Sequence, residues 1–364
     1  MDRGKKSSTS LANKNNRIYM DLKDIIRENA LCYLPAKSLR RCTGVCRDWK
    51  FHISTPFFAH SQSNSFRDVS GFFCQSSSSL PSFVSLDPIA FGVPDPSLKF
   101  LPEPVDIRCS TNGLLCCQGQ TGYNAYYICN PVTKQWKKLP KPDGYHGADP
   151  ALVLVFEPTL LNFVAEYTLI CAFPSDLDGY EFEIYSSNEA SWRTSREICF
   201  GNRQIVPRSG VHVDGTVYWK SINAGIIAFD LKTERSKLLP GCNACSYYSS
   251  GALGEVNKKL CYAFKNGTKV TLAELSNAFT NTMQMNNKTK AWTMKDVSLT
   301  LDNAWIDGWA RQGSVLFVGG DVMVIHLGKT LVPYNMRTKE VKQLTIEDVH
   351  DFRMVPYVNS LVDI

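Results

Sequence analysis

The sequence predicts a multidomain α + β protein: a small N-terminal unit of three helices, followed by an all-β propeller with six blades. Three observations carry this prediction. Residues 21–58 show the apolar spacing of short helices joined by breaks. From about residue 72 onward, β-branched and aromatic runs alternate with turns rich in Gly, Asn, Asp and Pro. Within that part, a turn motif recurs five times at intervals of 44 to 56 residues.

These observations divide the 364 residues into four segments. We expect a flexible basic tail over 1–19, the helical unit over 20–60, an extended Ser- and Pro-rich connector over 61–84 and the propeller over 85–364. Residues 1–50 hold 12 Lys and Arg against 5 Asp and Glu, so the net charge of +6 belongs to the N-terminal part. Its basic residues are scattered and not interleaved with aromatic ones, which favours an acidic protein partner over nucleic acid.

The helical unit begins with apolar residues that recur every four positions, as on one face of an amphipathic helix. A proline then ends this helix and fits the first turn of a second one, and Gly44 separates the second from a third. About forty residues cannot bury so many large side chains among themselves, so part of this surface should meet a partner. The residues expected at that interface are Leu22, Ile26, Leu34, Pro35, Leu39, Val45, Cys46 and Trp49. Leu34 and Pro35, at a helix junction, are favoured, whereas Trp49 in so small a unit is more often a core residue.

Each repeated turn has a short polar residue six positions before a residue that enters the next strand. The polar residues are Asn130, Ser186, Asp230, Asn286 and Asn335, and the later ones are Trp136, Trp192, Ser236, Trp292 and Val341. A short polar side chain can bond to the backbone two residues on and close the turn, and the later residue should pack inward. Five such units, with a sixth assembled from chain ends that close the ring, predict six blades. A β-sandwich with fortuitous turn similarity is the alternative.

Three spaced motifs of the helical unit resemble the plant F-box family. They are Leu34-Pro35-Ala36-Lys37-Ser38-Leu39, Val45-Cys46-Arg47-x-Trp49 and Ile53-Ser54-x-Pro56-x-Phe58. The family often opens its first helix with Leu-Pro, whereas Leu22 is followed here by Lys23. The resemblance implies docking onto a Skp-type adaptor, which connects to a cullin and to a RING subunit that brings the charged ubiquitin-conjugating enzyme. A helical cap that only packs on the propeller is the alternative.

Residues 85–364 resemble the F-box-associated, kelch-like domains of the same family. Gly319-Gly320 matches the kelch double glycine, although the turn tryptophan is missing at Ser236 and Val341. The resemblance implies a substrate receptor of a ubiquitin ligase, in which the propeller holds a protein substrate for degradation. An F-box scaffold that works without the cullin, and a propeller enzyme with a helical cap, are the two other hypotheses.

Two loops are expected to contact the protein substrate. One carries Trp305 and Trp309 among turn-forming and acidic residues, and the other, at residues 143–147, carries Tyr145 and His146. Trp and Tyr supply large contact areas at little entropic cost, so they often dominate the binding energy of interfaces. For Trp309, filling the space between two blades is an equal alternative.

The sequence lacks the usual marks of an enzyme. It contains no G-x-S-x-G, no G-x-x-x-x-G-K-[ST] and no H-E-x-x-H, and its six histidines are never paired at ligand spacing. Cys242 and Cys245 form the one C-x-x-C, with no second pair, so a loop pair is favoured over a metal site. We therefore expect no catalytic residue, metal or cofactor. Ubiquitin transfer would need only proximity from this chain.

The compartment is expected to be the nucleus, the cytoplasm or both. The first seventeen residues lack the apolar stretch of a signal peptide, and no run approaches the 18 apolar residues of a membrane helix. Without secretion, the thirteen cysteines should be reduced. Those expected among core residues include Cys116, Cys117, Cys129 and Cys261.

Overall fold

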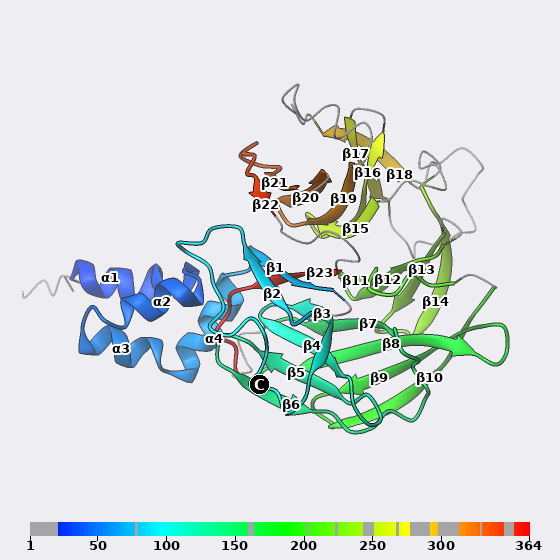
Figure 1. The fold of residues 1–364 in the computed structure, drawn as a ribbon, viewed down its shortest axis with the longest axis horizontal. Helices are drawn as coiled ribbons and strands as arrows, with labels where there is room; N and C mark the ends of the chain where they lie inside the picture. Colours follow the sequence, from blue (N-terminus) through cyan, green and yellow to red (C-terminus); the bar gives the residue numbers. More distant parts are fainter. Residues whose placement is uncertain are drawn as a thin grey trace, which may run out of the picture.

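The computed structural model shows a helical unit on one side of a ring of β-sheets (Figure 1). It describes residues 21–76, 79–158, 164–201, 204–222, 225–242, 251–266, 269–276, 292–297, 313–327, 330–345 and 353–364.

The helical unit has four α-helices and one 3-10 turn within the described residues. They are α1 (Leu22–Asn29), the 3-10 turn (Leu31–Tyr33), α2 (Ala36–Cys42), α3 (Arg47–Ile53) and α4 (Pro56–Ser65). The first helix is shorter than its apolar spacing predicts, because the chain tightens into the 3-10 turn after Ala30. The fourth helix was not predicted. It begins with Pro56 in its first turn, where Thr55 Oγ1 accepts a hydrogen bond from Phe58 N at 3.1 Å.

Five four-stranded antiparallel sheets follow in chain order. Blade A has β3 (Val105–Thr111), β4 (Leu114–Gly119), β5 (Tyr126–Asn130) and β6 (Gln135–Lys138). Blade B has β7 (Ala151–Phe156), β8 (Tyr167–Ser175), β9 (Gly179–Ser186) and β10 (Ser191–Phe200). Blade C has β11 (Val211–Val213), β12 (Thr216–Lys220), β13 (Gly225–Asp230) and β14 (Arg235–Pro240). Blade D has β15 (Gly251–Val256), β16 (Lys259–Asn266), β17 (Lys269–Leu275) and β18 (Trp292–Val297), and blade E has β19 (Ser314–Gly319), β20 (Val322–Leu327), β21 (Thr330–Asn335) and β22 (Leu344–Thr345).

A sixth sheet, blade F, closes the ring with strands from both ends of the propeller. Its order is β2 (Ser82–Ser85), β1 (Val69–Gln75) and β23 (Arg353–Val358), with Phe73 paired to Val355. The prediction of a six-blade ring closed by chain ends is therefore confirmed, and the sandwich is excluded. The expected connector over 61–84 instead holds the end of α4, β1 and most of β2, because closing the ring buries Phe72 and Phe73.

The core of the ring lies in the seams between blades, where each sheet packs its faces on its neighbours. Two of the repeated tryptophans cross these seams in the same way. Trp192 Nε1 donates to Pro140 O at 2.9 Å, and Trp292 Nε1 donates to Pro240 O at 3.1 Å. Each bond ties the outer strand of one blade to the end of the preceding blade.

Two of the four described turns close as predicted, by a bond to the backbone two residues on, whereas Asp230 and Ser186 accept from the main-chain N three residues on. Asn130 Oδ1 accepts from Val132 N at 2.9 Å, and Asn335 Oδ1 accepts from Arg337 N at 2.9 Å. The accompanying prediction of inward packing fails for two of the later residues. Trp136 is 43% exposed and Val341 is 40% exposed, whereas Trp192 and Trp292 are buried. The carbonyl groups that accept from Trp192 and Trp292 belong to Pro140 and Pro240 of the preceding blades. Turn spacing alone does not predict these contacts between blades. Asn286 lies outside the described residues.

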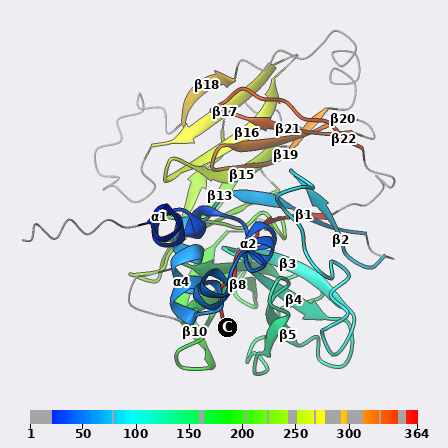
Figure 2. The ribbon, with the colours of Figure 1, turned by 90° about the vertical axis from the view of Figure 1, so that its left-hand side faces the viewer.

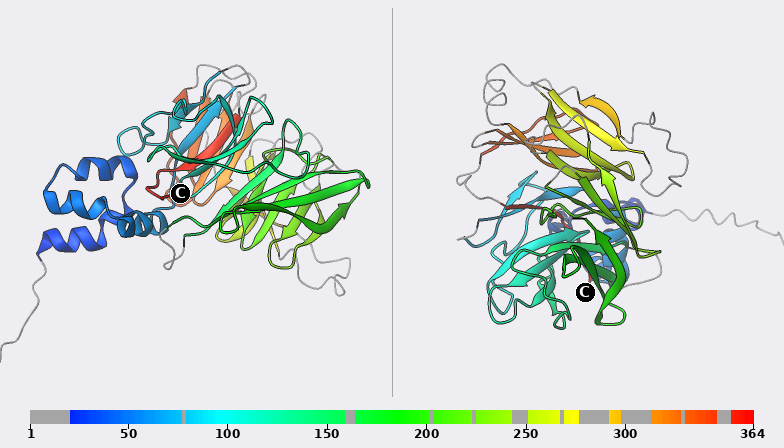
Figure 3. Two further views of the ribbon diagram at one scale, coloured as in Figure 1. Left: turned by 90° about the horizontal axis from the view of Figure 1, so that it is seen from below. Right: turned by 90° about the vertical axis from the view of Figure 1, so that its right-hand side faces the viewer.

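The two ends of the ring have different surroundings. In each blade one strand faces the centre, and these inner strands are β3, β7, β11, β15, β19 and β23. The helical unit and residues 359–364 contact the end of the ring at which the inner strands finish, as the view from the helices shows (Figure 2). We call the opposite end, where the inner strands start, the distal face (Figure 3, right).

Candidate functional site

The helical unit exposes several large apolar side chains. They are Leu22, Ile25, Tyr33, Val45, Phe51 and Phe57. Leu22 is 68% exposed and Val45 is 60% exposed, so both of these predicted interface residues are open to a partner. A small unit with this much apolar surface matches a protein-docking surface.

The other predicted interface residues help to hold the unit together. Pro35 and Leu39 are buried, and the latter packs with Leu31, Ile53 and Phe58. In this chain the helix junction faces α4 and the C-terminal segment, and a contact of these two residues with the adaptor stays a prediction.

Four further predicted residues are half-buried. Ile26, Leu34 and Trp49 lie at the edge of the same core. Cys46 begins α3, where its Sγ accepts a hydrogen bond from Trp49 N at 3.5 Å. These side chains shape the helical unit rather than forming its most accessible surface.

Asn359 joins the helical unit to the ring. Its main-chain O accepts from Ala36 N at 3.1 Å, and its Oδ1 accepts from Lys37 N at 3.0 Å. On the ring side, Asn359 Nδ2 donates to Gly92 O at 2.8 Å, and Asn359 N donates to Ser70 Oγ at 3.0 Å. Asn359 is fully buried, and its bonds, two of them partly and one fully buried, fix the start of α2 on blade F.

Gln62 of α4 makes a second buried connection. Its Nε2 donates to Leu34 O at 3.1 Å and to Asn359 O at 3.3 Å, while its Oε1 accepts from Leu361 N at 2.9 Å. One amide thus connects the helix junction, α4 and the C-terminal segment. The two parts of the chain are therefore held in one relative orientation.

Replacing Asn359 by alanine should weaken this junction. The change leaves Lys37 N and Gly92 O without their buried partners, at a cost of about 1–3 kcal/mol for each group. Urea unfolding should show the loss, with Asn188→Ala on an exposed turn as the control. Equal stability of the two variants would contradict the role given to Asn359.

A second region of dense polar contacts holds the loop between β6 and β7. Glu183 of β9 is fully buried and accepts from Asp143 N at 2.8 Å and from Gly144 N at 3.0 Å. His146 Nε2 bonds to the same carboxylate at 2.8 Å, and His146 Nδ1 bonds to Tyr126 OH at 3.0 Å. The loop is thus attached to blades A and B at once.

Arginines hold the other end of this loop. Arg108 of β3 donates to Ala148 O at 2.7 Å and pairs with Asp149. Arg208, in the segment before β11, also pairs with Asp149 at 2.7 Å. Tyr145, at the centre of the loop, is 87% exposed. A loop fixed by blades A and B and by the segment before β11 therefore presents one aromatic side chain to solvent on the distal face.

The carboxylate of Glu183 is held in its charged form. Burial by itself would raise its pKa, but hydrogen bonds from His146 and from the main-chain N–H groups of Asp143 and Gly144 outweigh burial and lower the pKa below its ordinary value. The folded state then binds a proton at Glu183 less readily than the unfolded state does. The resulting stability is present above the unfolded pKa of about 4.3 and is lost as pH falls through the folded value.

Glu183→Gln should therefore lower stability at neutral pH and flatten its acid dependence. The neutral amide cannot satisfy three donors as a carboxylate does, so we expect a loss of about 2–4 kcal/mol at pH 7. Unfolding measured at pH 7 and near pH 3.5 should show that the difference in free energy of unfolding between wild type and variant is smaller at the lower pH. A difference that does not change with pH would contradict the account of Glu183.

The distal face of blades A, B and C exposes five large apolar side chains. They are Tyr123, Tyr145, Leu177, Phe200 and Ile222. All five lie in turns, or at a strand end, on this side of the ring, and the β8–β9 turn that carries Leu177 points away from the helices in Figure 1. Of the predicted substrate contacts, the structure brings Tyr145 to this face.

The other two predicted substrate contacts have different outcomes. His146 is buried in the seam between blades A and B, where Glu183 and Tyr126 occupy both ring nitrogens. In the structure His146 positions the Tyr145 loop, and its contact with a substrate stays a prediction. Trp305 lies outside the described residues, as does Trp309.

Sequence reasoning missed Tyr123, Leu177, Phe200 and Ile222. A usable signal exists for Leu177, which stands between Asp176 and Asp178 in a short turn. In a short turn flanked by acidic residues, an apolar side chain has no core to pack against. Leu177 could therefore have been expected to be exposed. Phe200 carries no such signal, because an aromatic residue at the end of a strand is more often part of the core.

Other kinds of site find no support in the described part of the chain. No described helix has the length and apolar character needed to cross a membrane. Among the described residues, no group of three or more His, Cys, Asp or Glu side chains is placed to hold a metal ion. Tyr126, His146 and Glu183 form a chain of hydrogen bonds, but all three are buried and hold a loop.

Comparisons with known proteins agree on the family. The family model described as F-box protein At3g26010-like, beta-propeller, matches residues 97–350. F-box protein At5g07610 of Arabidopsis thaliana is 32% identical over 250 residues, which cover 61% of this chain and 57% of that protein. F-box protein At5g03970 of the same plant is 25% identical over 361 residues, covering 90% of this chain and 85% of that protein.

A third relative carries the kelch name. F-box/kelch-repeat protein At3g61590 of Arabidopsis thaliana is 30% identical over 129 residues, covering 35% of this chain and 31% of that protein. The alignments with At5g07610 and At3g61590 thus span less than two thirds of those relatives. With a propeller model matched over most of the ring and helices that carry the F-box motifs, this chain belongs to the F-box proteins with an At3g26010-like β-propeller.

Proposed function

We propose that this chain is a non-catalytic substrate receptor of a Skp-cullin-F-box ubiquitin ligase. The observation that carries the proposal is the fixed arrangement of two exposed apolar surfaces. One surface is on the F-box helices, and the other is on the distal face of the propeller. We place this activity in the nucleus, the cytoplasm or both.

The rigid junction suits such a receptor. Ubiquitin transfer is accelerated by holding a target lysine near a thioester carried by another subunit. A flexible connection would spread the target over many positions and lower its effective concentration. Asn359 and Gln62 instead tie the F-box to the ring through buried hydrogen bonds.

The chemistry of the distal face indicates what it binds. Tyr145 and Leu177 are accompanied by Asp143, Asp176 and Asp178, all exposed. None of these three carboxylates forms an ion pair with another described residue. An apolar patch with unpaired acids favours a target segment in which Lys or Arg flanks an apolar side chain.

Copurification tests the proposal against the two other hypotheses. With the proteasome blocked, the tagged chain should recover a Skp-type adaptor, a cullin and a target protein. Adaptor without cullin would instead support the cullin-independent scaffold, and an activity of the propeller on a small molecule would support the enzyme. Tyr145→Ala with Leu177→Asp should remove the target and retain adaptor and cullin, whereas Trp136→Ala, on an exposed outer strand, should remove neither.

A further inference from the structure

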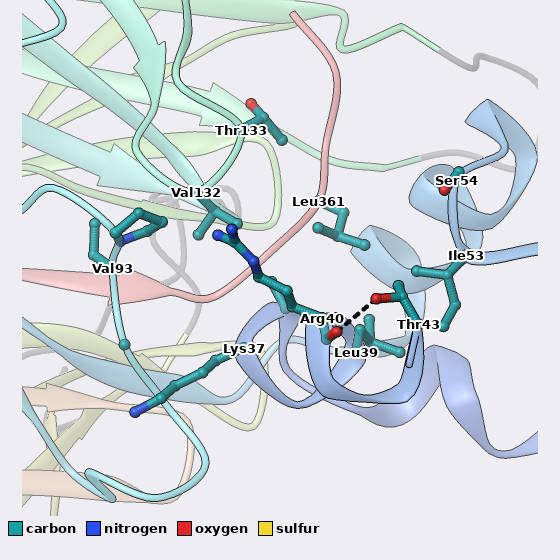
Figure 4. Close-up of a pocket in the computed structure, with 13 residues that line it drawn as sticks. Lys37, Leu39, Arg40, Thr43, Ile53, Ser54, Val93, Val132, Thr133 and Leu361 are labelled. Atoms are coloured by element: carbon teal, nitrogen blue, oxygen red, sulfur yellow. Dashed lines mark hydrogen bonds between the residues drawn. The ribbon is translucent and has the colours of Figure 1, made fainter. Parts of the chain in front are cut away.

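A cavity of about 490 Å³ lies between the F-box helices and the propeller (Figure 4). Its size falls within the range of small-molecule sites, about 300–1,000 Å³. Leu39 and Ile53 line it from the helices, Val93 and Val132 from the ring, and Leu361 from the C-terminal segment. The walls are therefore mainly apolar and come from both parts of the chain.

Among the described residues, the charged side chains that line this cavity are Lys37 and Arg40, both cationic, with no acidic side chain beside them. Lys37 is already engaged, because its Nζ donates to Pro88 O at 2.5 Å and to Phe91 O at 3.1 Å. The guanidinium of Arg40 has no acceptor among the residues that the structure describes. It extends from α2 toward Val132, across the gap between helix and ring (Figure 4).

The hydroxyl groups around the cavity are also engaged. Thr43 Oγ1 donates to Arg40 O at 2.7 Å, Ser54 Oγ donates to Lys50 O at 2.8 Å, and Thr133 Oγ1 donates to Gln135 Oε1 at 3.2 Å. Among the side-chain donors of the described lining residues, the unengaged one is then Arg40. Its planar guanidinium matches a carboxylate in two parallel hydrogen bonds.

We propose that this cavity binds a small amphipathic carboxylate, with its apolar body between helix and ring and its carboxylate on Arg40. A cationic ligand would face two positive charges, whereas a carboxylate gains charge-assisted hydrogen bonds from the exposed Arg40 that a neutral ligand does not. Because the walls belong to both parts, a bound ligand would strengthen the junction and raise the melting temperature. The inference does not rest on the proposed ligase function.

A binding screen on the full chain tests this proposal. The probes are a set of aryl and alkyl carboxylates, each with its primary amide, including biphenyl-4-carboxylate and biphenyl-4-carboxamide. We expect at least one acid to bind tenfold or more tightly than its amide, and to raise the melting temperature. Arg40→Gln should reduce its affinity about tenfold, whereas Arg47→Gln, an exposed arginine of α3 outside the cavity, should leave it unchanged.

A second variant separates loss of charge from loss of fold. Thr133→Trp, in the β5–β6 turn, places a large ring in the cavity and should abolish binding while the melting temperature of the free protein stays near that of wild type. The proposal is overturned if no acid in the set binds, if acids and amides bind equally, or if Arg40→Gln binds as wild type does. It is also overturned if a bound Skp-type adaptor displaces the acid, which would make the cavity part of the adaptor interface.

Discussion

Leu22→Asp together with Val45→Asp should abolish binding of the Skp-type adaptor without unfolding the protein. Both side chains are mostly exposed on the F-box helices, so charge there perturbs a docking surface rather than a core. Apolar anchors at the centre of an interface cost about 2 kcal/mol or more each when lost, which predicts a decrease in affinity of a hundredfold or more for the pair. Titration of the purified adaptor into wild type and variant would measure this loss of affinity.

The matched control is Leu80→Asp together with Val164→Asp. These are an exposed Leu and an exposed Val outside the helical unit, so the chemical change is the same. The control pair should bind the adaptor as wild type does. If the two double variants bind equally, the adaptor surface lies elsewhere on the chain.

Ending the chain after residue 352 should prevent the propeller from folding. The missing strand β23 is the inner strand of blade F, and it buries Val355 and Tyr357 in the seam with blade A. Losing two large core side chains costs about 2–5 kcal/mol each, against a total stability of about 5–15 kcal/mol for a domain. The truncation also removes Asn359 and Leu361 from the junction with the helices.

Gel filtration and thermal melting would show this effect as aggregation or the absence of a cooperative transition. Arg353→Ala serves as the control, because it alters the same strand at a half-exposed position and keeps the buried pair. A truncated chain that melts like the full-length protein would rule out ring closure by β23.

The ring itself could be predicted because the residues that close its turns lie close together in the sequence. Asn130, Asp230 and Asn335 close their turns with their own side chains, and this chemistry recurs at a blade's spacing. Closure of the ring by chain ends could be predicted because the sequence leaves room for a sixth unit. The position of β1 could not be predicted, because its seven residues pair with a strand some 280 positions later and carry no local sign of that pairing.

The exposure of the predicted contact residues could be read from the sequence only in part, for a physical reason. Apolar spacing identifies the residues of a small helical unit, but it does not say which side meets a partner. Leu39 and Val45 look alike in sequence, yet one is buried and the other is open. Similarly, Tyr145 and His146 are neighbours in sequence, yet the first is exposed and the second is buried. The reason is that His146 forms a hydrogen bond with Glu183 of β9.

The lifetime of a target protein tests the receptor account most directly. In cells, a target recovered with the chain should disappear faster when wild-type receptor is raised, and this loss should stop when the proteasome is blocked. The Leu22→Asp, Val45→Asp variant keeps the distal face but lacks the adaptor surface. We predict that it binds the same target and lengthens its half-life beyond that in cells without added receptor. A variant that shortens the half-life as wild type does would contradict the account.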